Sequence, residues 1–191
     1  MWDYTDRRIA QEVGKGLWLG PYTAAKDEAF MKTISHVLIV AGEVETKFLR
    51  PQFPEQAVYR AMVLEDSPYV PIFPLLIEAV QWIRAALVQG GRVLVHGNSG
   101  MSRSAAVVVG YLIAAENFTY DQAFRHVQSV RQCVSLSDSL KIQLKAFEPY
   151  VRSLPASGAC TVPAAPGPGG RRKRGREDIT EDSGELFFEA K

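Results

Sequence analysis

The stretch from residue 93 to residue 113 constrains the fold more than any other part of the chain. Residues 93–96 form an apolar, β-branched run that predicts a buried strand, and residues 104–113 form a longer apolar run that predicts a buried helix. The loop between them, 97–103, is rich in small residues, ends in an arginine and opens directly into the helix. A buried strand that feeds a helix through a short loop is typical of an α/β sheet, so we predict that fold class.

The composition of this loop favours the binding of an anion. Backbone N–H groups at a helix N-terminus have no partner within the helix and lie at the positive end of its dipole, so they can converge on a phosphate group. Gly97 and Gly100 can adopt positive φ, and Arg103 can hold two phosphate oxygens with its planar guanidinium. The predicted phosphate-binding residues are Gly97, Asn98, Ser99, Gly100, Met101, Ser102 and Arg103.

Residues 96–104 read His-Gly-Asn-Ser-Gly-Met-Ser-Arg-Ser, which resembles the signature His-Cys-x-x-Gly-x-x-Arg-Ser/Thr of the dual-specificity phosphatases. The resemblance implies a central, mostly parallel, twisted sheet flanked by helices, with a phosphate-binding loop between a buried strand and a helix. In active members the cysteine is a thiolate that attacks phosphorus and forms a phosphocysteine. Gly97 stands at that position and has no side chain, so we predict no catalytic residue and no phosphatase activity.

One inactive, pseudophosphatase branch of this family carries the same replacement, and three segments resemble it: 2–8, 17–22 and 95–106. The likeness extends over about residues 2–150 and departs most at 136–140. It implies that the partners are phosphorylated proteins, among them mitogen-activated protein kinases, together with an F-box subunit of a ubiquitin ligase. It implies no cofactor.

Two residues that flank the loop, and its arginine, each allow a structural alternative. Arg103 either faces an anion or forms a salt bridge to a local carboxylate. We expect His96 to support the loop by hydrogen bonding to its backbone rather than to transfer a proton. Ser104 hydrogen-bonds the thiolate in active relatives, and here it is either a support for the loop or only the first residue of the helix.

Three further residues are candidates for vestigial or replacement chemistry. Active relatives carry a general acid on a loop after the third strand, and Glu65 and Asp66 occupy the corresponding region. The sequence does not decide which of the two matches that acid, and both are also compatible with a solvated loop. Cys133 is better explained as a small buried hydrophobic residue than as a replacement nucleophile.

The charge balance excludes whole-surface attraction to polyanions. The 191 residues hold 22 basic and 21 acidic side chains, so we expect neither nucleic acid nor a membrane as a partner. The longest uncharged run, 105–115, is too short for a membrane span, and the charged first residues do not resemble a signal peptide. Two cysteines without metal-ligand spacing predict reduced thiols and no metal. We expect a monomer inside the cell.

Periodicity along the rest of the chain predicts the other elements of the sheet and its helices. Thr119 and Gln122 have the spacing of a capping box and predict a helix start. The expected strands are 16–20, 35–40 and 58–64, and the expected helices are 23–32, a pattern from 76 to 87, one after Thr119 and 138–151.

Composition divides the chain into a phosphatase-like domain, 1–152, and a tail, 153–191. The tail is rich in proline, glycine and alanine, then basic at 171–176 and acidic at 177–185, so we expect it to be disordered. The basic run is either a nuclear-import signal or a solvated charge run. With the family resemblance, it predicts a location in the nucleus and cytoplasm.

Three functions are compatible with these observations. The first is a non-catalytic module that binds phosphorylated serine, threonine or tyrosine and so modulates kinase signalling and F-box ubiquitin-ligase assembly. The second is a scaffold that uses a surface away from the loop, and the third is an active phosphatase with an unrecognised nucleophile. For the first, the rim of the site is expected at Tyr22, 43–54 and 68–73.

Overall fold

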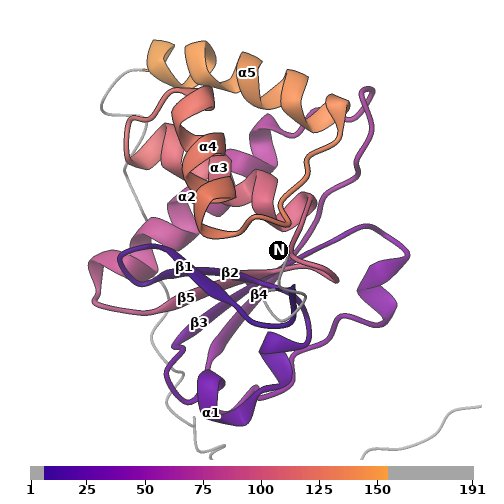
Figure 1. The fold of residues 1–191 in the computed structure, drawn as a ribbon, viewed down its shortest axis with the longest axis vertical. Coiled ribbons are helices and arrows are strands. Elements are labelled where there is room, and N and C mark those ends of the chain that lie inside the picture. Colours follow the sequence, from indigo (N-terminus) through magenta and orange to yellow (C-terminus); the bar gives the residue numbers. More distant parts are fainter. Residues whose placement is uncertain (1–6, 155–191) are drawn as a thin grey trace, which may run out of the picture.

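The computed structural model describes residues 7–154, which form a five-stranded sheet with strand order β1-β2-β5-β3-β4. β1 pairs with β2 antiparallel, and the other neighbouring pairs are parallel, which confirms the predicted mostly parallel α/β sheet (Figure 1). The strands are β1 (Gln11–Gly14), β2 (Leu17–Gly20), β3 (His36–Ala41), β4 (Val58–Val63) and β5 (Val93–His96).

Four long helices cover one face of the sheet, two short helical segments lie on the other face, and a third follows β3 at the edge of the sheet (Figure 1). The long helices are α2 (Phe73–Val88), α3 (Arg103–Ala115), α4 (Tyr120–Val130) and α5 (Asp138–Ser153). The short segments are α1 (Glu28–Met31) and the 3-10 turns η2 (Ala24–Lys26) and η3 (Glu45–Lys47).

The two faces of β5 and β3 pack into two different apolar cores. In β5, Val93 and Val95 face the helical layer, whereas Leu94 faces the smaller core around α1. This alternation follows from the two-residue period of a strand, and burial on both faces explains the continuous apolar run in the sequence. Because β5 is central, it carries the loop that follows it to the carboxyl edge of the sheet, where ligands of open α/β folds bind.

Two parts of the sequence-based prediction differ from the structure. The expected helix 23–32 is wrong: η2 and α1 are separated by Asp27, whose extended backbone and side-chain bond to the Phe30 N–H cap a new helix. β1 was not predicted, because it is a short edge strand whose only buried side chain is Val13. Its existence depends on pairing with β2.

The remaining elements agree with the prediction to within a few residues at their ends. Thr119 and Gln122 form the complete capping box of α4, with both reciprocal hydrogen bonds present. Ser137 caps α5 by accepting a bond from the Leu140 N–H at 3.2 Å. Side chains therefore fix both helix starts locally; the capping box of α4 was expected from the residues, whereas the Ser137 cap was not predicted.

Several predictions fall on residues 1–6 and 155–191, outside the described residues, and stay predictions. They include most of the tail, with Cys160 and its basic and acidic runs. Within residues 7–154, Cys133 is a buried free thiol and no helix is long and apolar enough to span a bilayer. The same residues contain no cluster of histidine, cysteine and carboxylate side chains suited to a metal ion.

Candidate phosphate-binding site

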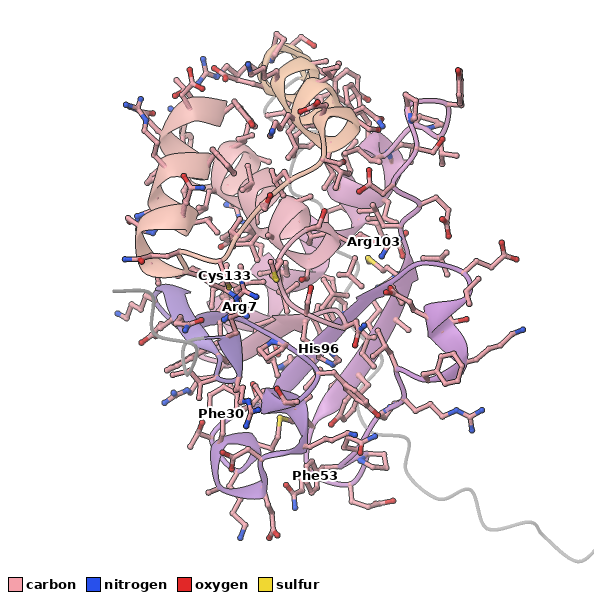
Figure 2. All side chains as sticks on the ribbon, turned by 45° about the vertical axis from the view of Figure 1, so that its right-hand side comes forward. Arg7, Phe30, Phe53, His96, Arg103 and Cys133 are labelled. Atoms are coloured by element: carbon pink, nitrogen blue, oxygen red, sulfur yellow. The ribbon has the colours of Figure 1, made fainter. Side chains whose placement is uncertain are left out.

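The loop lies between the last residue of β5, His96, and the first residue of α3, Arg103 (Figure 2). It surrounds a small polar cavity of about 80 Å³. The cavity is lined by Val40, Glu45, Gly97, Asn98, Ser99, Gly100, Met101, Ser102, Arg103 and Ser104. All the predicted phosphate-binding residues therefore meet at one cavity. Glu45 joins them from η3, inside the predicted rim segment 43–54.

Every backbone carbonyl from residue 97 to residue 102 accepts a hydrogen bond from outside the loop. The donors are His96 Nδ1 to Gly97 (3.1 Å), Tyr22 N to Asn98 (3.1 Å), Arg131 Nη2 to Ser99 (3.0 Å), Arg131 Nε to Gly100 (2.9 Å), Ser135 N to Met101 (3.0 Å) and Ala106 N to Ser102 (2.8 Å). These bonds fix the orientation of each peptide group in the loop.

The opposite ends of these peptide groups are unpaired. Among the described residues, no acceptor receives a hydrogen bond from the backbone N–H groups of 98–102. These residues line the cavity, so its wall presents a run of backbone donors at the start of α3. Successive N–H groups in this arrangement form a concave site for an anion.

Two positions in the loop favour glycine for different structural reasons. Gly100 has φ of 69°, and a Cβ there would lie 2.3 Å from the carbonyl oxygen of Gly20. Gly97 does not adopt the positive φ that its residue type allows, but a Cβ there would lie 2.9 Å from the carbonyl oxygen of Val40. The strand neighbours therefore close the space that a side chain at position 97 would need.

Arg131 supports the loop from behind and was missed by sequence reasoning. Its side chain is fully buried, and besides the two loop carbonyls it donates to the carbonyls of Ile9 and Arg7 and to the side chain of Gln11. One guanidinium thus joins the loop to the segment before β1. The only signal in the sequence is a charged residue between the apolar Val130 and Val134.

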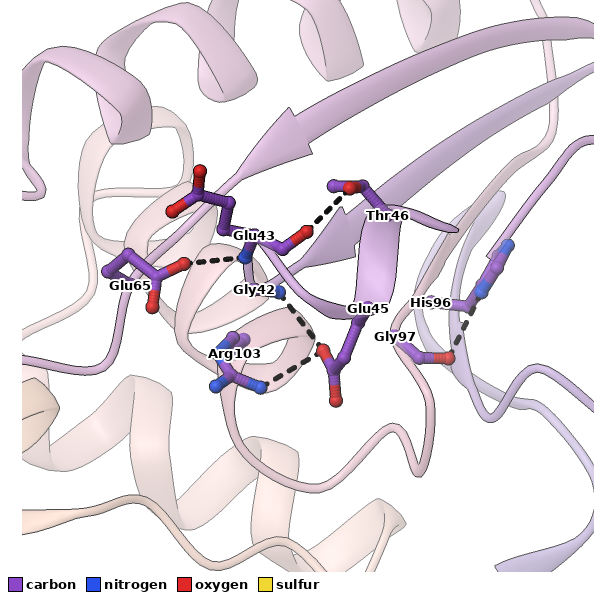
Figure 3. A network of polar contacts seen from close by, with 8 residues as sticks. All are labelled: Gly42, Glu43, Glu45, Thr46, Glu65, His96, Gly97 and Arg103. Atoms are coloured by element: carbon purple, nitrogen blue, oxygen red, sulfur yellow. Dashed lines mark hydrogen bonds and ion pairs between the residues drawn. The ribbon is translucent and has the colours of Figure 1, made fainter. Parts of the chain in front are cut away.

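Arg103 forms the salt bridge that was one of its two alternatives, and its position at the cavity is compatible with the other, an anion. Arg103 lines the cavity, and its Nη1 also donates to Glu45 Oε2 at 3.1 Å (Figure 3). The guanidinium lies against Gly42, where a Cβ would be 3.1 Å from Nη2. Its Nε is buried and has no partner among the described residues, so part of its donor capacity is unused.

His96 supports the loop, as expected, and is neutral near pH 7. Burial lowers its pKa from 6.5 to about 4, although the hydrogen bond to Gly97 opposes this shift. A carbonyl oxygen only accepts, so Nδ1 carries the proton of the neutral ring. Tyr22, predicted for the rim, stacks on the imidazole with ring centroids 5.8 Å apart.

The lowered pKa of His96 predicts an acid-sensitive fold. The unfolded chain binds a proton near pH 6.5 and the folded protein only near pH 4, so stability is lost as the pH falls through this window. We expect a loss of about 3 kcal/mol between pH 7 and pH 4 in urea unfolding experiments. His96→Asn, which keeps a donor for Gly97, flattens this dependence. His36, whose pKa is also lowered by burial, contributes in the same direction and remains in both proteins. If the unfolding free energy of His96→Asn falls with pH as steeply as that of wild type, His96 is not the source of the acid sensitivity.

The two acid candidates do not line the cavity. Glu65 Oε1 accepts a hydrogen bond from the Glu43 N–H at 2.6 Å, and Asp66 accepts one from the Ser137 hydroxyl. Each carboxylate therefore holds a neighbouring segment in place. Ser104 lies in the first turn of α3, and its Oγ is 3.4 Å from where a Cβ on Gly97 would be. Cys133 is not among the residues that line the cavity.

Comparison with known proteins agrees with this geometry. The family model of the dual specificity phosphatase catalytic domain matches residues 17–149. Serine/threonine/tyrosine-interacting protein B of Xenopus laevis is 36% identical over 151 residues, which cover 77% of this chain and 68% of that protein. Dual specificity protein phosphatase 1 of Arabidopsis thaliana is 34% identical over 147 residues, which cover 76% and 72%.

A solved structure shows the same fold at similar identity. The crystal structure of human tyrosine phosphatase-like serine/threonine/tyrosine-interacting protein has a TM-score of 0.72 and 32% sequence identity, and the match covers 77% of this chain and 100% of that chain. Both interacting proteins and phosphatases are thus similar to this sequence over most of its length. With its strand, loop and helix in the matched region, the chain belongs to the dual specificity phosphatase family.

Proposed function

We propose that this protein is a non-catalytic member of its family that binds phosphorylated serine, threonine or tyrosine residues of partner proteins. The observation that carries the proposal is the loop in which the carbonyls of 97–102 bond outward while the N–H groups of 98–102 remain unpaired at the cavity. Unpaired N–H groups that converge on one cavity favour an anionic ligand. A tetrahedral phosphoryl group presents several oxygens to convergent donors, which suits this site.

The same site supports binding without hydrolysis. Gly97 offers no nucleophile, and the space beside it is closed by the carbonyl of Val40. Glu65 and Asp66 are hydrogen-bonded to other segments, so neither is positioned at the cavity to protonate a leaving oxygen. A bound phosphoryl group would therefore be retained. Retention would shield the phosphorylated residue from active phosphatases.

The partners proposed for this activity come from the family resemblance. They are mitogen-activated protein kinases, and an F-box subunit whose ubiquitin-ligase assembly the protein would regulate. The polar cavity supports a phosphorylated residue as the common feature of such partners, and the rim around Tyr22 and Glu45 would select among them.

We expect Arg103→Ala to weaken phosphate-dependent binding about 30-fold. The guanidinium is the only cationic side chain among the residues that line the cavity, and the loss of a hydrogen bond to a charged group weakens binding by a factor of this size. The measurement is calorimetric titration with a phosphorylated activation-loop peptide and with its unphosphorylated twin. Wild type should prefer the phosphorylated peptide.

Arg50→Ala is the matched control, because Arg50 is an exposed arginine of the rim segment 43–54. It removes the same charge without touching the loop, and we expect the preference for the phosphorylated peptide to persist. Equal binding of both peptides to wild type would favour the scaffold instead. Steady turnover of the phosphorylated peptide by rigorously purified wild type would favour an active phosphatase.

A further inference from the structure

A carboxylate of the chain itself already lies in the phosphate-binding cavity. Glu45 is one of the residues that line it, and a single oxygen, Oε2, accepts from Arg103 Nη1 at 3.1 Å and from the Gly42 N–H at 3.0 Å (Figure 3). An oxygen that accepts from a guanidinium and from a backbone N–H makes the contacts that a phosphoryl oxygen would seek there.

The segment that carries Glu45 is held by bonds of its own. The Glu45 N–H donates to the Gly42 carbonyl at 2.9 Å, the Thr46 hydroxyl donates to the Glu43 carbonyl at 2.6 Å, and the Glu43 N–H donates to Glu65. These bonds preserve the turn when the Glu45 side chain changes rotamer. The carboxylate can therefore leave Arg103 without unfolding the segment.

The ion pair is weak enough to be displaced. The side chains of Arg103 and Glu45 are each 30% exposed, and ion pairs in contact with water contribute little net stability. Arg103 Nε remains without a partner among the described residues, so Glu45 does not use the full donor set of the guanidinium. A ligand that satisfies Nε as well as Nη1 would bind more donors than Glu45 does.

We infer that Glu45 is an internal competitor of the phosphate-binding loop, an autoinhibitory contact that any anionic ligand must displace from Arg103. The inference rests on the proposed function. Only the fraction of molecules in which Glu45 has left Arg103 is competent to bind, so the apparent affinity is lowered by that fraction. The loss is the same for every tetrahedral anion, whatever its charge, because each one displaces the same contact.

The test compares two probes of the same shape and different charge, phenyl phosphate and phenyl sulfate. At about pH 7.5 the first is mainly a dianion and the second a monoanion, since the second pKa of a phosphate monoester is about 6. Dissociation constants are measured by following the backbone amide resonances of 98–102 in NMR titrations at constant ionic strength. The proteins are full-length wild type, Glu45→Gln and Glu43→Gln.

Glu45→Gln keeps an oxygen for the Gly42 N–H and removes the charge. We expect it to increase the affinity for both probes by the same factor, about three- to five-fold, which corresponds to the free energy of an exposed ion pair. Glu43→Gln is the matched control, because Glu43 is exposed on the same segment and its carboxylate has no partner among the described residues. We expect it to change either affinity by less than about two-fold.

Other outcomes overturn the inference in distinguishable ways. Weaker binding by Glu45→Gln would show that Glu45 positions Arg103 for the ligand. The increase in the logarithm of the affinity caused by Glu45→Gln could be twice as large for the dianion as for the monoanion, or Glu43→Gln could increase the affinity as much as Glu45→Gln does. Either result would show general electrostatic repulsion. In both cases the proposed function survives, since wild type still binds phenyl phosphate. Failure of all three proteins to bind either probe overturns the proposed function together with the inference.

Discussion

Gly97→Cys is expected to hydrolyse 4-nitrophenyl phosphate, while wild type does not, and to leave phosphoserine peptides almost untouched. The new thiol would stand among the unpaired N–H groups of 98–102 at the start of α3, an environment that lowers a thiol pKa and yields the nucleophilic thiolate. A nitrophenolate leaves without help from an acid. A serine alkoxide does not, and the absence of a positioned acid costs about 10²- to 10⁴-fold in rate.

The variant also has to make room for its Cβ. That atom would lie 2.9 Å from the carbonyl oxygen of Val40, which belongs to the backbone of β3, so the strand end or the loop must shift by a few tenths of an ångström. We expect a loss of about 1–2 kcal/mol in unfolding free energy, measured in urea. Gly97→Ala is the matched control, because it meets the same oxygen and has no thiol.

The measurement is the initial rate of hydrolysis of 4-nitrophenyl phosphate and of a phosphoserine peptide. If Gly97→Cys hydrolyses a phosphoserine peptide as fast as the aryl phosphate, then Glu65 or Asp66 reaches the leaving oxygen, and their bonds to Glu43 and Ser137 are not lasting. If a folded Gly97→Cys protein is inert on both substrates, the loop no longer orients a phosphoryl group for attack. Turnover by Gly97→Ala at the same rate would identify a contaminant.

Arg131→Met is expected to destabilise the fold more than Gly97→Cys does. The buried guanidinium donates to the carbonyls of Ser99, Gly100 and Ile9, and methionine fills similar volume without any donor. Each buried carbonyl left without a partner costs about 1–3 kcal/mol, so we expect a loss of about 3–5 kcal/mol in chemical unfolding. Phenyl phosphate binding should be lost as well, because the freed carbonyls no longer fix the peptide groups of the loop.

Arg125→Met is the corresponding control in helix α4, which Arg131 directly follows, since Arg125 is exposed and its Nε donates to the carbonyl of Asp121 within that helix. We expect it to change the unfolding free energy by less than about 0.5 kcal/mol. A similarly small change in Arg131→Met would mean that water replaces the guanidinium at the loop. If a destabilised Arg131→Met protein still bound phenyl phosphate, Arg131 would be needed for the stability of the fold and not for the binding geometry of the loop.

Sequence-based prediction succeeded where the signal is local. The run 93–96 is apolar because β5 is buried on both faces, and a strand followed by a loop and a buried helix has few alternatives. The predicted capping box of α4 is formed by Thr119 and Gln122, which are only three positions apart. The prediction of one helix over 23–32 was wrong for an equally local reason, because the Asp27 side chain caps the start of a new helix.

The sequence by itself determined that a strand, a small-residue loop and a helix follow one another and that glycine stands at the nucleophile position of the family signature, because both properties belong to consecutive residues. Only the tertiary structure decided what surrounds that loop. Glu45 reaches Arg103 across 58 positions of sequence because β3 lies beside β5, so the loops after both strands meet at one edge. Arg131 reaches Ser99 because α4 packs against α3. Such contacts depend on strand order and helix packing, which the free energy of the whole fold selects and no local residue pattern encodes.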